Sequence, residues 1–297
     1  MHPSPRRLTL VLLLLLGPAF VAAGPAPDRD RVPEGVTLHR DLEYGRVGDR
    51  ALLLDLYVPE NAEGRLPLIV WVHGGAWRAG NKSNCPAIRL TAQGYVVASV
   101  GYRLSQEAVF PAQIQDCKAA IRWLRANAEK YHIDPDRIGA WGASAGGHLV
   151  AMLGTAGDVK EFDVGDHLDQ SSKVQAVVDF FGPAELHTMG DAYSTMKHNA
   201  PDSPESLLIG APILENAEKA KRASPVTYVS NDDAPILIMH GNKDVTVPHD
   251  QSVRFEKALR EAGVDVTFHT VEGAGHGFGG PEIDRRVNEF FEKHLKK

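Results

Sequence analysis

The sequence predicts an α/β fold, with a mostly parallel central sheet, an antiparallel N-terminal hairpin and helices on both faces. Continuous apolar runs, such as 66–72 and 95–100, are typical of strands that are covered on both faces. Segments with helical spacing, such as 113–130, separate these runs. Because strand and helix alternate over most of the chain, we expect one sheet and a single domain over residues 36–297.

The hairpin is expected first in chain order. Two extended stretches, 36–44 and 51–57, flank the turn-forming sequence GRVGD. In the second stretch Leu52, Leu54 and Leu56 alternate with less apolar neighbours, as in a half-buried strand. Further strands are expected at 66–72, 95–100, 138–141, 174–181, 234–240 and 264–271, and helices at 113–130, 148–153, 253–261 and 285–296.

The N-terminus has the features of an export signal. Arg6 and Arg7 precede an apolar run, 8–23, that ends in Val-Ala-Ala. The run is short for a spanning helix and small residues follow it, which favours a cleaved signal peptide over a membrane anchor. We therefore predict a signal peptide at 1–23, a disordered leader at 24–35, and a secreted or periplasmic protein.

Composition and charge restrict the partners. The chain is 43% hydrophobic and 24% charged, as in ordinary globular proteins, and its formal charge is -6. No basic run follows the N-terminal segment, so we expect neither nucleic acid nor a stable membrane partner. Cys85 and Cys117 leave open one disulfide or two free buried thiols. The oligomeric state stays open.

Residues 184–233 interrupt the alternation of strand and helix. This stretch is too long for a plain connection, and it holds Pro201, Pro204, Pro212 and a short helical piece around 215–221. In an open α/β sheet such an insertion often covers the ligand crevice. The alternative is a purely structural segment at the rim of the sheet, and both interpretations stay open.

The strongest chemical signal is the pentapeptide Gly-Ala-Ser-Ala-Gly at 142–146. It follows the strand expected at 138–141 and precedes the helix expected at 148–153, which is the context of a nucleophile elbow. Glycines on both sides allow strand and helix to approach closely. The serine sits at a helix N-terminus, where the dipole favours developing negative charge. Ser144 is therefore the predicted nucleophile.

A second motif, His-Gly-Gly-Ala-Trp at 73–77, follows the strand expected at 66–72. Acyl transfer needs backbone N–H groups that point at the oxyanion, and glycines let a loop present them. We assign the oxyanion donors to Gly74, Gly75 and Ala145. His73 is expected to brace this loop.

The acid and the base are expected on two later loops. Asp244 ends the loop after the buried strand 234–240, at the edge where strand ends form a crevice. His276 lies in a glycine-rich loop after the strand 264–271. Asp232 and Asp233 precede their strand and so lie at the wrong edge, and His269 lies inside a strand. Together with Ser144, the chain order Ser, Asp, His is that of α/β-hydrolases.

The chain resembles the α/β-hydrolase esterases and lipases with an HGG oxyanion loop. It is most similar to secreted bacterial proteins related to bifunctional feruloyl and acetylxylan esterases, which carry stretches like FPAQIQDCKAA (110–120), YHIDPDRIG (131–139) and ASPVTYV (223–229). The resemblance covers roughly residue 36 to the C-terminus. It implies the same catalytic and oxyanion residues, although Ala76 replaces a glycine that many relatives have third in the loop.

The combined motifs predict a serine carboxylic ester hydrolase that needs neither cofactor nor metal. Expected substrates are short-chain or carbohydrate-linked acetyl and feruloyl esters, and Trp77 and Tyr102 are candidate pocket residues. Phe181 is expected to be core. A prolyl-oligopeptidase-like serine exopeptidase, which usually carries an extra domain, and a non-catalytic hydrolase-fold binding protein are the alternatives.

Overall fold

The computed structural model describes residues 32–60 and 63–296. The predicted signal peptide and residues 24–31 of the predicted leader lie outside the described residues. The end of that leader belongs to the fold, because the Gly35 carbonyl accepts a hydrogen bond of 2.9 Å from the Glu60 amide. No helix in the described ranges has the length and apolar character needed to cross a bilayer.

One eight-stranded sheet organises these residues, in the order β1-β2-β4-β3-β5-β6-β7-β8. The antiparallel pairs are β1 with β2 and β2 with β4, and all later pairs are parallel. The predicted hairpin and parallel sheet are thus confirmed. The strands are β1 (Val36–Val47), β2 (Arg50–Pro59), β3 (Leu66–Val72), β4 (Val96–Val100), β5 (Ile133–Ala143), β6 (Ala176–Phe180), β7 (Ile236–Gly241) and β8 (Val266–Val271).

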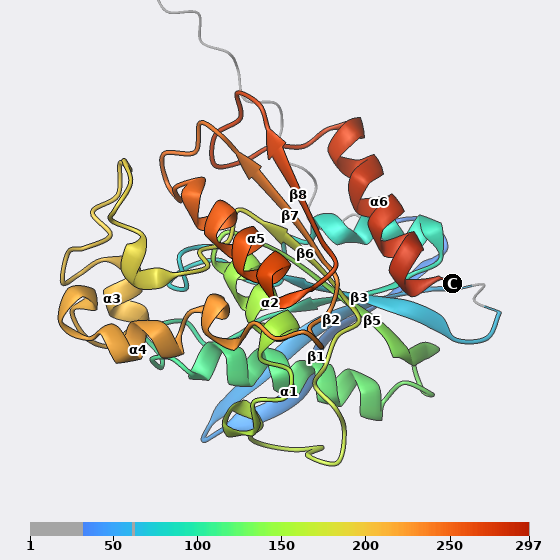
Figure 1. The fold of residues 1–297 in the computed structure, drawn as a ribbon. Coiled ribbons are helices and arrows are strands. Elements are labelled where there is room, and N and C mark those ends of the chain that lie inside the picture. The colour runs from blue at the N-terminus through green and yellow to red at the C-terminus, as the bar shows by residue number, and fades with distance from the viewer. Residues whose placement is uncertain (1–31, 61–62, 297) are drawn as a thin grey trace, which may run out of the picture. The chain divides into compact units, whose positions relative to one another are not determined.

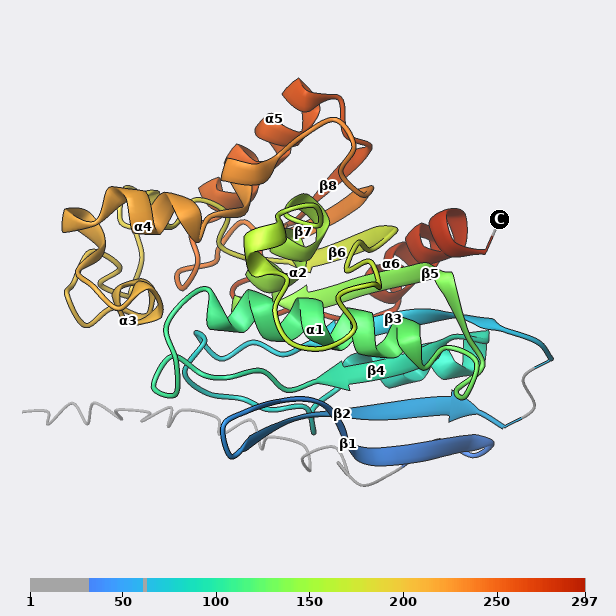
Figure 2. The same cartoon turned by 90° about the horizontal axis from the view of Figure 1, so that it is seen from below.

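Helices cover both faces of the sheet (Figures 1 and 2). On one face α1 (Ala112–Ala126), α2 (Ala145–Thr155) and α5 (Asp250–Ala262) contribute Ile121, Leu149 and Phe255 to one apolar core. On the other, α6 (Pro281–Leu295) and the short helix η1 (Pro86–Gln93) contribute Phe291 and Leu90 to a second core. The predicted helices are all present, with ends shifted by a few residues.

The two cysteines lie in these two different cores and are both free and buried. Cys117 is part of α1, and Cys85 precedes η1 on the other side of the sheet. The sheet separates them, so the disulfide that the sequence left open does not form. The second alternative, two buried thiols, is the one observed.

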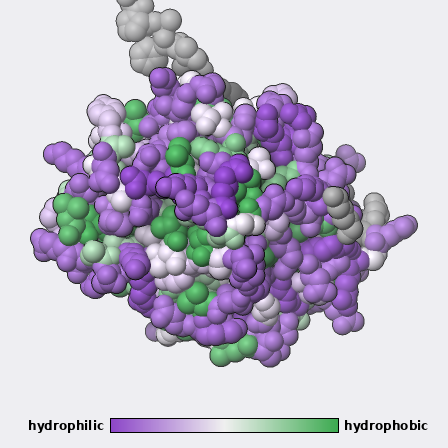
Figure 3. All heavy atoms as spheres, viewed as in Figure 1, coloured by the Kyte–Doolittle hydropathy of each residue, from purple (hydrophilic) through white to green (hydrophobic). Residues whose placement is uncertain are grey.

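The insertion between β6 and β7 contains short helices rather than plain loop. They are η3 (Leu186–Thr188), α3 (Pro204–Ile209), η4 (Ile213–Glu215), α4 (Ala217–Arg222) and η5 (Pro225–Tyr228). The predicted helical piece around 215–221 corresponds to η4 and α4. Figure 1 shows α3 and α4 projecting to one side of the sheet. On the face seen in Figure 3 most of the surface is hydrophilic, with apolar residues in small groups.

Candidate active site

Ser144 occupies a sharp turn between β5 and α2. Its φ is +56°, in the left-handed region that a non-glycine residue rarely adopts, at a cost of roughly 1–3 kcal/mol. The flanking glycines make the turn possible. A Cβ on Gly142 would lie 2.2 Å from the Gly146 carbonyl oxygen, and one on Gly146 would lie 2.1 Å from that of Val72. The predicted elbow therefore exists, and its glycines are sterically required.

The structure brings the three predicted catalytic side chains into one row. His276 Nε2 lies 2.9 Å from Ser144 Oγ, and His276 Nδ1 lies 2.6 Å from Asp244 Oδ2. Because the carboxylate accepts, Nδ1 carries the proton and leaves the Nε2 lone pair for the serine hydroxyl. The row joins residues from the loops after β5, β7 and β8, as expected from the chain order.

Asp244 is fully engaged in hydrogen bonds. Its Oδ1 accepts the amides of Thr246 and Val247 at 2.8 and 3.0 Å, and its Oδ2 accepts His240 Nε2 at 3.1 Å besides His276. Burial alone would raise the pKa of Asp244, but the hydrogen bonds from the two histidines hold this pKa well below its usual range. The carboxylate thus stays ionised and fixed in orientation.

His240 was not assigned a role from the sequence. It lies in β7, one residue before the strand ends, and is fully buried, and its Nε2 also lies 3.0 Å from the Val247 carbonyl oxygen. Since a carbonyl only accepts, Nε2 is protonated, and Nδ1 accepts from Ser252 Oγ at 2.7 Å. His240 therefore gives Asp244 a second imidazole donor. The sequence places this histidine near the end of a buried strand, four residues before the acid, but nothing in it indicates the contact with Asp244.

Two of the predicted oxyanion residues, Gly74 and Ala145, lie beside Ser144. A Cβ on Gly74 would lie 3.3 Å from the Ser144 Cβ, and Ala145 is the first residue of α2. Gly75 has φ +114°, and its carbonyl accepts the amides of Arg78 and Ala79, both at 3.0 Å. Within the described ranges, no loop or turn hydrogen bond uses the amides of Gly74, Gly75 or Ala145. These amides remain available to a substrate oxygen.

Buried side chains hold the loop at 73–77 in place through hydrogen bonds and ring stacking, as expected for His73. His73 Nδ1 donates to the Gly74 carbonyl at 2.8 Å, and its ring stacks on Tyr102 at 4.4 Å. Tyr102 in turn donates to the His73 carbonyl at 3.0 Å. Trp77 Nε1 donates to His148 Nδ1 at 3.1 Å, while His148 Nε2 donates to a carbonyl of the insertion, that of Ala223, at 2.7 Å.

These contacts correct the expectation for Trp77 and Tyr102. Their exposed fractions are 2% and 3%, and the polar atom of each ring bonds within the protein. Both side chains support the loop from inside, so substrate contact by either is not supported. The sequence could not distinguish an aromatic residue that lines a pocket from one that supports the loop. The two differ only in the direction in which the side chain points.

The model of the BD-FAE family matches residues 54–259. The chain belongs to the BD-FAE family.

Relatives of this BD-FAE chain are esterases. It is 31% identical to esterase LipC of Mycobacterium tuberculosis, over 86% of this chain and 64% of that one. A solved truncated carbohydrate esterase from gut microbiota is 37% identical, with a TM-score of 0.81, covering 93% of this chain and 100% of that chain. The acetyl ester-xyloside bifunctional hydrolase of Caldicellulosiruptor lactoaceticus is 26% identical, with a TM-score of 0.66, over 83% and 86%.

The chain spans about half to two thirds of the length of the curated relatives it matches first, from 51% to 64%. Their names nevertheless agree on the class of enzyme. LipC and LipQ are esterases, and LipM is a probable carboxylic ester hydrolase. Carboxylic ester hydrolase is also the enzyme class that the sequence predicts.

An aromatic pocket of about 370 Å³ adjoins the elbow of this BD-FAE chain. Ala143, which precedes Ser144, lines it, as do Phe181 and Phe278. Phe181 was expected to be core, and it is buried, but its ring also contacts that of His276 at 4.6 Å. The remaining lining residues are Trp71, Asn84, Pro86, Arg89, Trp141, Phe180, Gly279, Ile283 and Asp284. Phe181 thus lines this pocket and also contacts the base His276.

Asp179, in β6 beside the elbow strand, yields a pH prediction. It is buried, and burial raises its pKa to about 7, even though the Gly182 amide donates to its Oδ1 at 2.9 Å. Between pH 4 and 7, roughly, the folded chain keeps a proton that the unfolded chain loses, so the unfolding free energy falls as pH rises, by about 4 kcal/mol at most from this group. We expect Asp179→Asn, which can still accept from Gly182, to remove that slope.

The measurement is the melting temperature of wild type and Asp179→Asn across this pH range, with Asp49→Asn in the exposed β1–β2 turn as control. The variant should gain most over wild type near neutral pH. A constant difference at every pH would contradict a protonated Asp179.

Proposed function

We propose that this protein is a serine carboxylic ester hydrolase that forms an acyl-enzyme on Ser144. The observation that carries the proposal is the row Ser144–His276–Asp244, with distances of 2.9 and 2.6 Å. The amides of Gly74, Gly75 and Ala145, which no described loop or turn hydrogen bond uses, support it. The esterase relatives support the reaction class.

The proposed mechanism uses only groups of the chain. His276 Nε2 takes the Ser144 proton while Oγ attacks the ester carbonyl carbon. The carbonyl oxygen becomes an oxyanion that accepts from the three backbone amides. His276 then gives its proton to the alkoxy oxygen, the alcohol leaves, and the same imidazole activates a water that hydrolyses the acyl-enzyme. Asp244 stabilises the imidazolium that forms twice in this cycle.

We further propose acetyl or feruloyl esters on carbohydrate, or other short-chain esters, as substrates. The aromatic pocket beside His276 suits a flat aromatic acyl group. Two of the similar solved structures are those of a carbohydrate esterase and of an acetyl ester-xyloside bifunctional hydrolase. The basic and apolar N-terminal segment supports export, which would bring the enzyme to such polymers.

The test is a substrate panel of acetylated xylan, methyl ferulate and p-nitrophenyl esters of increasing acyl length. We expect hydrolysis of the short p-nitrophenyl esters and release of acetate or ferulate from at least one natural ester. Methyl ferulate turnover with slow cleavage of long-chain esters would support the aromatic pocket. Failure to cleave any ester and to react with a fluorophosphonate would overturn the reaction class. Faster cleavage of an aminoacyl-proline amide would indicate the peptidase alternative.

A further inference from the structure

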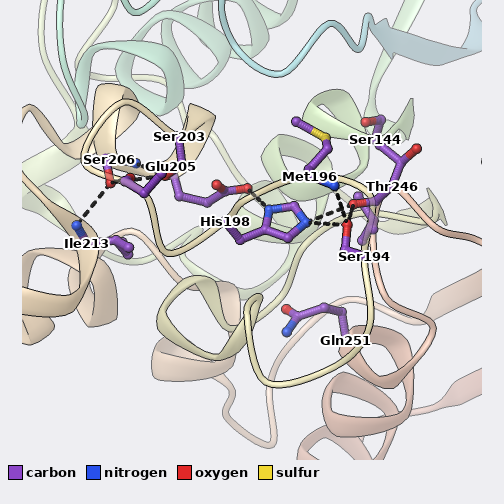
Figure 4. Close-up of polar contacts among 12 residues, drawn as sticks. Ser144, Ser194, Met196, His198, Ser203, Glu205, Ser206, Ile213, Thr246 and Gln251 are labelled. Atoms are coloured by element: carbon purple, nitrogen blue, oxygen red, sulfur yellow. Dashed lines mark hydrogen bonds and ion pairs between the residues drawn. The ribbon is translucent and has the colours of Figure 1, made fainter.

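A buried imidazole–carboxylate pair lies in the insertion, away from Ser144. His198 and Glu205 each have an exposed fraction of 2%, and His198 Nδ1 lies 2.9 Å from Glu205 Oε1. Figure 4 shows the ring between Glu205 and Thr246. Burying an ion pair costs desolvation energy, which its hydrogen bonds must offset. The hydrogen-bond partners of His198 therefore indicate which segment the pair holds in place.

The other edge of the ring bonds to the loop that carries the acid. His198 Nε2 lies 2.9 Å from the Thr246 carbonyl oxygen, which can only accept, so Nε2 is protonated. Burial lowers the pKa of His198, but the hydrogen bond and charge of Glu205 raise it more, to a net value above the ordinary one. The ring thus donates at both edges, to Glu205 and to Thr246.

Neighbouring residues bond to the same turn. Thr195 donates to the Val245 carbonyl through its amide at 2.7 Å and through Oγ1 at 2.9 Å. Ser194 Oγ lies 2.9 Å from that carbonyl oxygen and 3.2 Å from that of Thr246. The segment 194–198 therefore bonds both carbonyls of the turn that follows Asp244.

Two peptide groups connect this segment to the acid. The Val245–Thr246 peptide accepts at its oxygen from Ser194 and Thr195, and its N–H donates to Asp244 Oδ1 at 2.8 Å. The next peptide accepts from His198, and its N–H, that of Val247, donates to the same Oδ1 at 3.0 Å. In a planar trans peptide C=O and N–H point in opposite directions, so the insertion holds one side and Asp244 the other. A hydrogen bond at the oxygen also polarises the N–H toward its acceptor.

We infer that His198 and Glu205 are positioning residues, which orient the two peptide groups that in turn orient the Asp244 carboxylate. The inference rests on the proposed function, because it assumes that Asp244 directs His276. Neither residue touches the reacting atoms. The insertion then contributes to catalysis through the acid loop, whatever its role in covering the site.

The test uses two substitutions that differ in which edge of the ring they replace. In His198→Gln the side-chain NH₂ can reach the position of Nε2 and keep the bond to Thr246, whereas in His198→Asn it reaches only the position of Nδ1 and Glu205. We expect His198→Asn to lower kcat by about tenfold to a hundredfold with little change in KM, and His198→Gln to recover most of the loss.

Stability is separated from positioning by Ser203→Ala. Ser203 lies in the same insertion and caps α3 by accepting the Ser206 amide, but it does not contact the turn. This variant should lower the melting temperature and leave kcat unchanged. If His198→Asn does not fold, Thr195→Val, which removes only the Oγ1 donor to Val245, replaces it and should lower kcat severalfold.

A readout apart from activity is the proton NMR signal of the His276–Asp244 hydrogen bond, which should shift in His198→Asn and return in His198→Gln. Equal kcat and an unshifted signal in every folded variant would overturn the inference. Wild type that cleaves no ester would instead refute the proposed function. An active wild type with unaffected His198 variants would refute the inference alone.

Discussion

Replacement of Ser144 by alanine is expected to lower kcat for ester hydrolysis by roughly six orders of magnitude. The proposed acyl-enzyme needs the Ser144 hydroxyl, and without it only the backbone amides remain to stabilise an attack by water. The fold should survive, because the side chain of Ser144 bonds to His276 while its amide and carbonyl hold the turn, through Phe180 and His148.

This prediction is measured with a short p-nitrophenyl ester and by titration with a fluorophosphonate. Ser171→Ala, at an exposed position, is the matched control and should behave as wild type. The Ser144→Ala variant should melt near the wild-type temperature and take up no fluorophosphonate. A residual rate within a hundredfold of wild type, from a preparation free of wild-type enzyme, would show that another group is the nucleophile.

Asp244→Asn is expected to lower kcat by about four orders of magnitude, with the fold intact. The two amides of Thr246 and Val247 point at Oδ1, so the amide oxygen of the new side chain must occupy that position. Its NH₂ group then replaces Oδ2 and faces His276 Nδ1. His276 has to accept there, which moves its proton to Nε2. In that tautomer the imidazole cannot take the proton of Ser144.

The matched control for this variant is Asp233→Asn. Asp233 lies before β7, at the opposite edge of the sheet, where it accepts the Ser230 amide, and its replacement should leave kcat unchanged. The loss in Asp244→Asn should lie in kcat rather than KM, because the carboxylate does not contact the substrate. A loss of less than tenfold would mean that His276 reaches its working tautomer without the carboxylate.

Local pattern was sufficient for the fold class and for the three residues of the row. Continuous apolar runs mark strands that are buried on both faces, and in a parallel sheet the ends of such strands meet at one edge. Ser144, Asp244 and His276 each follow a strand at that edge, so their meeting followed from topology. The glycines around Ser144 were predictable for the same reason, since a close approach of strand and helix excludes a Cβ.

Contacts between segments that are far apart in the chain depended on packing. The sequence named Trp77 and Tyr102 as pocket residues, but both side chains are buried against the protein interior. It left the cysteines open, and the sheet separates them. It also gave no indication that His240 bonds to Asp244, or that His198 bonds to the turn after it.

The sequence by itself thus determined the architecture and which hydroxyl, imidazole and carboxylate meet, because both follow from periodicity and from the order of strand ends. The tertiary structure alone decided which aromatic rings brace the oxyanion loop, which thiols stay apart, and which further imidazoles hold the acid. These depend on side-chain direction and on hydrogen-bond partners from remote segments, which no local pattern encodes.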